Sequence, residues 1–342
     1  MAGKERTRAE LQPGALVTVF GGSGFIGQHV VQALGRRGYR VRVAVRRPNE
    51  ALFVKTSGVV GQIEPVQANI RDDRSVRAAV EGASAVINLV GIMSESGPQG
   101  FDAVQATGAG RVARAAAAAN VPIMIHVSAI GADPKSPSAY ARAKAAGEQA
   151  VREHMPRAAI LRPSIVFGAE DRLFNRFAAL ARLMPFFPLI GGATRFQPVY
   201  VKDVAEAVVR ALETDAVDGK IVELGGPEVM TMRQMMELVL RETRRKRVLV
   251  PVPFALAKLK ALVLQLLPNP LLTVDQVRLL AIDNVVGESA TAEGRTLQGL
   301  GIAPTAPEAI LPFYLVRFRR RGQFEPAPDF AATIEHEELK QS

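Results

Sequence analysis

Cysteine is absent from this chain of 342 residues. Its absence excludes disulfides, thiolate metal sites and cysteine nucleophiles. Tryptophan is absent too, and the four histidines (His29, His126, His154 and His336) lack the spacing of metal ligands. We therefore expect no metal site, and any chemistry must rest on other side chains.

Long apolar runs are also missing. A transmembrane helix needs about 20 apolar residues, and no run of that length here is free of charges. Residues 1–16 are polar and mixed in charge, unlike a signal peptide or a transit peptide. The expected location is the cytosol or an equivalent compartment, with peripheral contact to the cytoplasmic face of a membrane as a variant of it.

Acidic residues are outnumbered, with 33 Asp and Glu against 43 Lys and Arg and a formal net charge of +10. Part of the excess lies in two clusters, RETRRKR at 241–247 and RFRRR at 317–321. Such clusters favour an anionic membrane surface or an acidic partner, or they are simply solvated. Aromatic residues are few, so nucleic acid is not an expected partner.

The strongest positive signal is residues 17–47, VTVFGGSGFIGQHVVQALGRRGYRVRVAVRR. An apolar run leads into three spaced glycines, then a helical pattern, then a second apolar run. This strand, glycine turn, helix and strand form the unit that binds a dinucleotide. The glycines permit a tight turn and let backbone N–H groups approach a pyrophosphate. The predicted cofactor-binding residues here are Gly21, Gly24, Phe25, Ile26 and Gly27.

The end of the second strand predicts which dinucleotide binds. An NAD site usually has an acidic residue there, which holds the ribose 2′-OH. This chain has Arg46 and Arg47 instead. Guanidinium groups form bidentate, charge-assisted bonds with a 2′-phosphate. We therefore expect NADP(H) to be favoured over NAD(H), unless the two arginines only belong to a basic surface.

The rest of the pattern alternates strands with helices and predicts an α/β fold, a doubly wound parallel sheet (Rossmann) with a smaller C-terminal lobe. Asp203 is expected to cap a helix at 203–213, and Thr231 a helix at 231–243. The expected domains are a polar N-terminal segment at 1–14, an NADP-binding Rossmann domain at 15–168 completed by 198–225, a C-terminal lobe at 169–197 and 226–322, and a loose tail at 323–342.

Three residues are candidates for catalysis. Tyr140 and Lys144 are four apart at the start of a predicted helix, so they share one face. A lysine ammonium beside a tyrosine lowers the pKa of the phenol, which can then exchange a proton with a carbonyl or hydroxyl group. Ser128 follows the predicted strand 122–127, where open α/β sheets bind ligands, and it can orient a carbonyl oxygen. Alternatively, the Tyr140 and Lys144 pair only holds the cofactor ribose.

These motifs together resemble the short-chain dehydrogenase/reductase superfamily, in its extended or atypical branch. The matching pieces, in the family's order, are GGSGFIG (21–27), ANIRD (68–72), NLVG (88–91), Ser128, YARAK (140–144), LRPSIVFG (161–168) and PVYVKDVA (198–205). The resemblance implies further cofactor contacts. It places Asn69 and Ile70 near the adenine, Leu89, Val90 and Gly91 beside the cofactor, and Pro163 and Ile165 at the nicotinamide.

Later segments are similar to one branch, the Rossmann-type accessory subunit of respiratory complex I and its bacterial relatives. They are residues 161–178, 197–208, 272–280 (LTVDQVRLL) and 297–310. The resemblance implies a tightly held, structural NADPH and a partner in complex I at the membrane. Gln105 and Ala129 stand where typical extended members have Asn and Ser or Thr. The alternative therefore stays open: a soluble NADPH-dependent reductase or epimerase acting on a lipophilic, quinone-related or sugar-like substrate.

The apolar segment 254–267, which contains Lys258 and Lys260, has two interpretations. The first is a buried core helix of the second lobe, which we favour. The second is a helix lying in a membrane interface, with its lysines reaching anionic headgroups.

Overall fold

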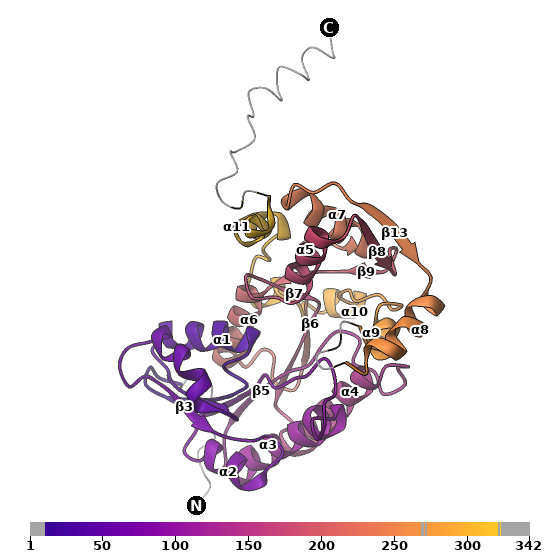
Figure 1. Cartoon of the computed structure of the whole chain (residues 1–342). Helices are drawn as coiled ribbons and strands as arrows, with labels where there is room; N and C mark the ends of the chain where they lie inside the picture. The colour runs from indigo at the N-terminus through magenta and orange to yellow at the C-terminus, as the bar shows by residue number, and fades with distance from the viewer. Residues whose placement is uncertain (1–10, 268–269, 271, 321, 323–342) are drawn as a thin grey trace, which may run out of the picture.

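The computed structural model describes residues 11–267, 270, 272–320 and 322. Figure 1 shows two lobes, one formed by the N-terminal half of the chain and one mainly by its last third. The predicted tail at 323–342 and residues 1–10 of the predicted N-terminal segment lie outside the described residues.

The larger lobe is built on a seven-stranded parallel sheet with strand order β11-β6-β5-β4-β1-β2-β3. The order reverses direction at β1, as expected for a doubly wound sheet. This confirms the predicted fold class. The strands are β1 (Leu16–Phe20), β2 (Arg40–Val45), β3 (Ile63–Gln67), β4 (Ala85–Asn88), β5 (Ile123–Val127), β6 (Ala159–Pro163) and β11 (Ile221–Leu224).

Helices cover both faces of this sheet because alternate strand residues point to opposite faces. On one face, Val17 and Val19 pack with residues of α1 (Phe25–Arg36) and α6 (Val201–Glu213). On the other face, Phe20 and Val86 pack with residues of three helices, α2 (Asp73–Val80), α3 (Thr107–Ala118) and α4 (Ala139–His154). The 3-10 helix η2 (Pro48–Ser57) and the π-helix η3 (Asp102–Ala106) also belong to this lobe.

The smaller lobe has its own core, formed by Phe167, Phe174 and the methionines of α7 (Met232–Glu242). Thr231 caps α7 in a capping box with Gln234, as predicted. The remaining elements are β7 (Val166–Phe167), α5 (Leu173–Leu183), β8 (Phe186–Ile190), β9 (Arg195–Phe196), β10 (Val199–Tyr200), β12 (Met230–Thr231), β13 (Val248–Val252), α8 (Phe254–Leu264), α9 (Val274–Leu279), α10 (Glu288–Ala292), η4 (Gln298–Leu300), α11 (Pro307–Leu315) and η5 (Val316–Phe318). Of these, η4 packs against the core of the larger lobe, through Leu297 and Leu300.

Two sequence expectations are wrong. Asp203 does not cap α6, which begins two residues earlier; its carboxylate instead accepts hydrogen bonds from the backbone N–H (2.7 Å) and hydroxyl (3.1 Å) of Thr305. The segment 254–267 is not a buried core helix. In α8 only Ala257 and Ala261 are buried, while Leu259 is 62% exposed. Apart from Phe254 at its start, which is partly buried, this helix turns small residues to the lobe and most of its leucines and valines to solvent, the reverse of a core helix.

Among the described residues, no helix has the length and apolarity needed to cross a bilayer.

Candidate functional site

The predicted cofactor residues all lie at the carboxyl edge of the parallel sheet. Gly21 follows β1, Arg46 follows β2, Asn69 follows β3 and Leu89 follows β4. Pro163 is the last residue of β6. Strands that run in parallel end at one edge, which is where open α/β sheets bind ligands. Segments far apart in sequence therefore meet along this edge (Figure 1).

The glycine turn between β1 and α1 is too tight for side chains. Gly21 has φ +79°, and a Cβ there would lie 3.3 Å from the carbonyl carbon of Leu89. A Cβ on Gly27 would lie 2.2 Å from the Gly21 oxygen, so only glycine lets α1 approach the turn. Helix α1 starts after Gly24 with no side-chain cap and no acidic residue in its first turn. An uncapped helix N-terminus at the end of β1 fits the pyrophosphate of a dinucleotide.

The two predicted 2′-phosphate arginines have different surroundings. Arg47 is exposed and its Nη1 lies 3.0 Å from Glu50 Oε1. Arg46 Nη1 instead lies 3.1 Å from the side-chain amide of Gln99, which accepts a second bond of 3.1 Å from Nη2 of Arg71 once its oxygen faces both guanidinium groups. Arg71 also donates to the Pro98 carbonyl. Neither Arg46 nor Arg71 has a carboxylate partner among the described residues, so the structure brings Arg71, and not Arg47, together with Arg46.

At the end of β3, Asn69 and Ile70 form a fixed turn. The side-chain oxygen of Asn69 accepts a bond from the backbone N–H of Arg71 (3.1 Å), and the backbone N–H of Asn69 donates to Ser75 Oγ (3.0 Å). Ile70 is buried and close to Gly108 of α3. The turn therefore holds Arg71 in place beside the adenine position that the resemblance implies.

The candidate catalytic residues lie together but their electrostatics differ from expectation. Lys144 is buried, its Nζ lies 5.9 Å from the ring centroid of Tyr140, and it donates to the Val127 carbonyl (3.2 Å) next to Ser128. Burial raises the pKa of Tyr140 to about 12. Burial also lowers the pKa of Lys144 to about 8, against the opposing charge of Glu148. The expectation that the lysine lowers the pKa of the phenol is therefore wrong for this structure, because desolvation dominates.

Polar atoms without partners surround this pair. Both side-chain atoms of Gln105, the hydroxyl of Ser128 and Nε2 of His126 are buried and make no hydrogen bond. Gln105 lies in the π-helix η3, and π-helical turns are frequent at functional sites. A Cβ on Gly91 would lie 3.5 Å from Lys144 Nζ and 3.6 Å from Gln105 Oε1, so these three residues border one space. Buried polar atoms need partners, and the polar ribose and nicotinamide of a dinucleotide would supply them.

Two site residues were missed by the sequence reasoning. The Asp275 carboxylate of α9 accepts hydrogen bonds at the start of α4, the helix that carries Tyr140 and Lys144. Asn284 donates from Nδ2 to the Ile130 carbonyl (2.9 Å) and accepts from Ser164 Oγ (2.7 Å). The motif LTVDQVRLL contains Asp275 and gave a family signal, but nothing in it indicated a contact with α4.

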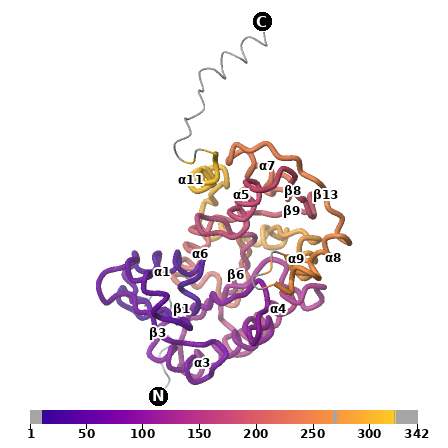
Figure 2. Tube along the Cα trace, in the orientation of Figure 1, coloured from indigo at the N-terminus to yellow at the C-terminus, as the bar shows by residue number. Residues whose placement is uncertain are grey.

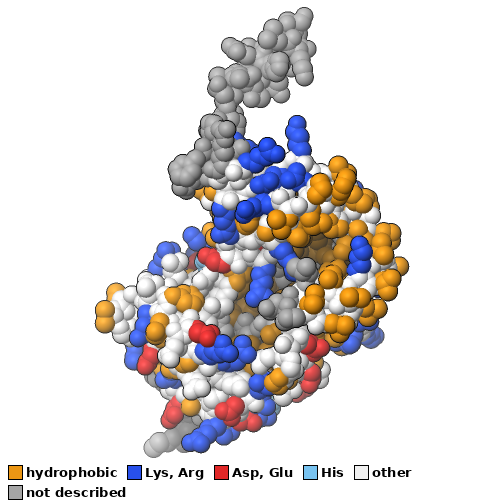
Figure 3. Space-filling model, viewed as in Figure 1, with side chains coloured by type: hydrophobic (Ala, Val, Ile, Leu, Met, Phe, Trp, Pro, Cys, Tyr) orange, Lys and Arg blue, Asp and Glu red, His pale blue; other side chains and the backbone are white. Residues whose placement is uncertain are grey.

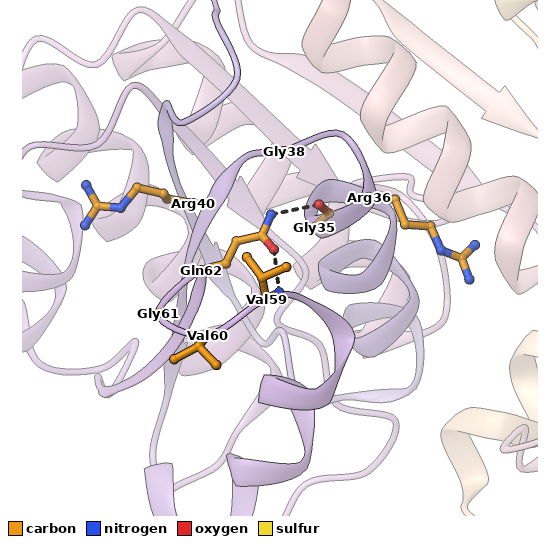
Figure 4. A pocket seen from close by; sticks show the side chains of 8 residues that line it. All are labelled: Gly35, Arg36, Gly38, Arg40, Val59, Val60, Gly61 and Gln62. Atoms are coloured by element: carbon orange, nitrogen blue, oxygen red, sulfur yellow. Dashed lines mark hydrogen bonds between the residues drawn. The ribbon is translucent and has the colours of Figure 1, made fainter.

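A hollow lies away from the carboxyl edge of the sheet, at the amino ends of β2 and β3 (Figure 4). Gln62 spans its wall by donating to the Gly35 carbonyl (2.7 Å) and accepting from the Val59 N–H (2.9 Å). The side chains of Arg36 and Arg40 point away from it. This hollow brings no predicted site residue together. Within the described ranges, no three His, Asp or Glu side chains are placed to hold a metal ion.

Comparison with known proteins places the chain in a family. Residues 17–225 match the NAD dependent epimerase/dehydratase family. A relative in Arabidopsis thaliana, NADH dehydrogenase [ubiquinone] 1 alpha subcomplex subunit 9, mitochondrial, is 35% identical over 334 residues, covering 94% of this chain and 81% of that protein. The ceramide reductase of Caulobacter vibrioides is 33% identical over 199 residues, covering 58% of this chain and 61% of that protein.

Among solved structures, the dTDP-glucose 4,6-dehydratase of Streptomyces venezuelae with bound NAD superposes with a TM-score of 0.68 at 20% identity, covering 90% of this chain and 98% of the other. This likeness concerns the fold. The match over residues 17–225 and the relative that is 35% identical show that the chain belongs to the NAD dependent epimerase/dehydratase family, with subunit 9 of complex I among its relatives.

Proposed function

We propose that this chain is an NADP(H)-binding protein of the complex I accessory type, which holds its dinucleotide mainly as a structural element and works at a membrane surface. The sequence similarity to subunit 9 of complex I supports the assignment to the complex I accessory type. The observation that carries the proposal is the pairing, in one chain, of a carboxylate-free arginine pair at the dinucleotide edge with an exposed apolar helix in the second lobe.

The preference for NADP(H) rests on Arg46 and Arg71. Two guanidinium groups that share one neutral amide repel each other, and an anion between them would relieve this cost. A 2′-phosphate can accept charge-assisted bonds from both. The remaining predicted contacts stay as proposed: the glycine turn at the pyrophosphate, Asn69 and Ile70 at the adenine, Leu89 to Gly91 beside the cofactor, Tyr140 and Lys144 at the ribose, and Pro163 and Ile165 at the nicotinamide.

The membrane contact rests on α8 and its neighbours. Leucines and valines of this helix and of the turn after it are exposed, and so are Lys258 and Lys260. We define the α8 face as Leu256, Leu259, Leu262, Val263, Leu266 and Leu267. Figure 3 shows apolar side chains gathered over this part of the second lobe, with Lys and Arg beside them at the top of the same view. Apolar side chains flanked by lysines suit the interface of an anionic membrane, which we propose as the occupant.

Several arginines of the two basic clusters, 241–247 and 317–321, are held by hydrogen bonds within the lobe. Arg245 donates to the Phe318 carbonyl (2.8 and 3.1 Å) and Arg319 to the Glu242 carbonyl (2.9 Å), so the two clusters pack together. Arg247 likewise donates to the Ala181 carbonyl (2.9 Å). Replacing these arginines would disturb the lobe itself. The exposed lysines, Lys246, Lys258 and Lys260, are cleaner probes of an anionic surface.

A sedimentation experiment tests the proposal. The protein should pellet with vesicles that contain anionic lipid at low salt and be partly released at high salt, because basic residues near such a surface contribute about 1 kcal/mol each. The triple change Lys246→Gln, Lys258→Gln and Lys260→Gln should weaken pelleting, and Leu259→Ser with Leu266→Ser should weaken it further. A matched control, Lys55→Gln, lies in the Rossmann lobe and should pellet normally. Pelleting with complex I membranes but not vesicles would show a protein partner instead, and pelleting with neither would end the membrane proposal.

The second candidate is a soluble NADPH-dependent reductase or epimerase for a lipophilic or sugar-like substrate. The specific observation in its favour is that Ser128, Tyr140 and Lys144 are all present and adjacent, with the Ser128 hydroxyl unpartnered. The relationship to a ceramide reductase adds support for a lipophilic carbonyl substrate. Bound NADPH would supply the hydride, while Tyr140 would donate the proton to the carbonyl oxygen oriented by Ser128.

A screen of carbonyl substrates with NADPH oxidation as readout separates the two candidates. If the protein is a reductase, Tyr140→Phe should abolish turnover while NADPH stays bound, because only the proton donor is lost. If the cofactor is structural, no substrate should turn over, and Tyr140→Phe should only slightly weaken binding. Turnover that survives Tyr140→Phe would remove this tyrosine from the mechanism.

A further inference from the structure

The start of helix α4 is held by a carboxylate from the other lobe. Asp275 Oδ1 accepts from the Ala139 N–H (2.7 Å), and Oδ2 accepts from the Tyr140 N–H (3.1 Å) and the Ser138 hydroxyl (2.7 Å). The Asp275 side chain is only 15% exposed. A carboxylate that accepts several N–H and O–H donors at a helix N-terminus also interacts favourably with the helix dipole. The backbone of Tyr140 is thus bonded directly to the second lobe.

The opposite side of α9 packs against α8. Val277, two residues after Asp275, forms a small buried cluster with Ala257 and Ala261, the only buried residues of α8. Figure 2 shows α9 between α8 and α4. A six-residue helix therefore joins the exposed α8 face to the helix of Tyr140 and Lys144.

The chain after α9 is bonded both to the smaller lobe and to the carboxyl edge of the parallel sheet. Leu280 accepts from Thr194 Oγ1 (2.6 Å), and Asn284 bonds the segments after β5 and β6 through Ile130 and Ser164. This fixes the far end of α9, so movement of α9 relative to the site would occur at its beginning, where Asp275 lies. Within α9, Asp275 makes three hydrogen bonds to the start of α4, and Arg278 adds a longer one of 3.4 Å to the Pro137 carbonyl just before it.

We propose that Asp275 is a positioning residue that couples the α8 face to the dinucleotide site. The coupling rests on the proposed membrane contact of α8 and on the proposed ribose contact of Tyr140 and Lys144. A membrane that immobilises α8 restrains α9, and through Asp275 it restrains the end of α4 that presents both side chains. Linkage is reciprocal: the bound dinucleotide must strengthen membrane binding by the same factor by which the membrane strengthens dinucleotide binding.

The experiment measures the release rate of bound NADPH by its fluorescence, using the full chain with and without vesicles that contain anionic lipid. Pelleting is scored in the same samples. For the unaltered protein, vesicles should slow release about fivefold, the lower end of typical allosteric coupling. Asp275→Ala should release NADPH about fivefold faster in solution and should not respond to vesicles. Its Ala139 and Tyr140 amides should exchange hydrogen about tenfold faster, as expected when N–H groups at a helix N-terminus lose their acceptor.

Two further variants separate coupling from a general loss of structure. Asp283→Ala removes a carboxylate from the same segment that pairs with Arg195, away from α4, and should behave like the unaltered protein. Asp275→Glu keeps the carboxylate and should recover part of the vesicle response. The Ser138 hydroxyl also accepts from the Ala141 N–H (3.3 Å), a bond that does not involve Asp275, so α4 should keep this cap and the variant should fold.

The outcomes are distinct. If Asp275→Ala and Asp283→Ala release NADPH at the same rate in solution, Asp275 does not position the site and the inference is wrong. If the unaltered protein pellets but vesicles leave release unchanged, or if Asp275→Ala responds as fully, the coupling is overturned while the membrane proposal stands. If nothing pellets, the membrane proposal fails and the coupling with it, and the solution rates alone decide whether Asp275 positions Tyr140.

Discussion

Arg46 and Arg71 set the preference for NADP(H) in this account, and removing either should reduce that preference selectively. Both guanidinium groups reach the same Gln99 amide, 3.1 Å from each, and neither pairs with a carboxylate of the described chain. A charge-assisted hydrogen bond contributes about 1.5–3 kcal/mol. Arg46 is exposed, so solvent screening places it at or below the lower end of that range. Arg46→Ala should therefore weaken NADPH binding roughly tenfold, and NADH binding hardly at all.

The matched control is Arg47→Ala. Arg47 is the neighbouring arginine and is exposed like Arg46, but its guanidinium is paired with Glu50. It should change NADPH affinity less than about twofold. Arg71→Gln should resemble Arg46→Ala, and the double variant should lose about 2–4 kcal/mol of NADPH binding, in line with two charge-assisted contacts. Calorimetric titration with NADPH and NADH measures each case. Equal affinities for the two dinucleotides in the unaltered protein, or an effect of Arg47→Ala as large as that of Arg46→Ala, would refute the reasoning.

Three other changes test separate parts of the account. Gly24→Val should abolish dinucleotide binding while the fold survives, because a branched side chain would fill the pyrophosphate space. Normal affinity in a titration would show that the dinucleotide binds elsewhere. Gly147→Val should destabilise the fold by several kcal/mol in a denaturant titration, because its Cβ would lie 2.1 Å from the Gln105 carbonyl oxygen; a small loss would mean that α4 readily moves off η3. Burial lowers the pKa of His126 to about 3 from 6.5. The imidazole therefore takes up a proton at a lower pH in the folded state than in the unfolded state. Stability should fall by up to about 1.4 kcal/mol per pH unit as the pH drops below 6.5, and His126→Gln should flatten that slope; identical slopes would show that His126 is not the group responsible.

The sequence predicted the parts of this protein that depend on local pattern. In the glycine turn at residues 21–27, backbone sterics alone require the spacing of the glycines and the positive φ of Gly21. This turn can therefore be predicted from the sequence. The alternation of apolar strands and amphipathic helices likewise indicates the doubly wound sheet. Thr231 caps its helix as predicted because a capping box spans only four residues.

The errors have in common that they depend on contacts between distant segments. Arg71 and Gln99 join Arg46 only after β2, β3 and the segment beyond β4 meet at one edge. Asp203 turned from an expected cap into the acceptor for Thr305, about a hundred residues away in sequence. Composition alone cannot tell a buried apolar helix from an exposed one, and α8 buries only its two alanines, with Phe254 partly buried beside them. The pKa of Tyr140 follows burial, which a sequence does not report.

If the dinucleotide is a structural element, this protein retains NADP(H) through purification, and a native mass spectrum of the purified protein measures this. We expect a dominant species that carries one NADP(H), which shifts to the unliganded mass in the Gly24→Val variant. A spectrum that shows bound NAD(H), or a protein that carries no dinucleotide and gains none when NADPH is added, would contradict it.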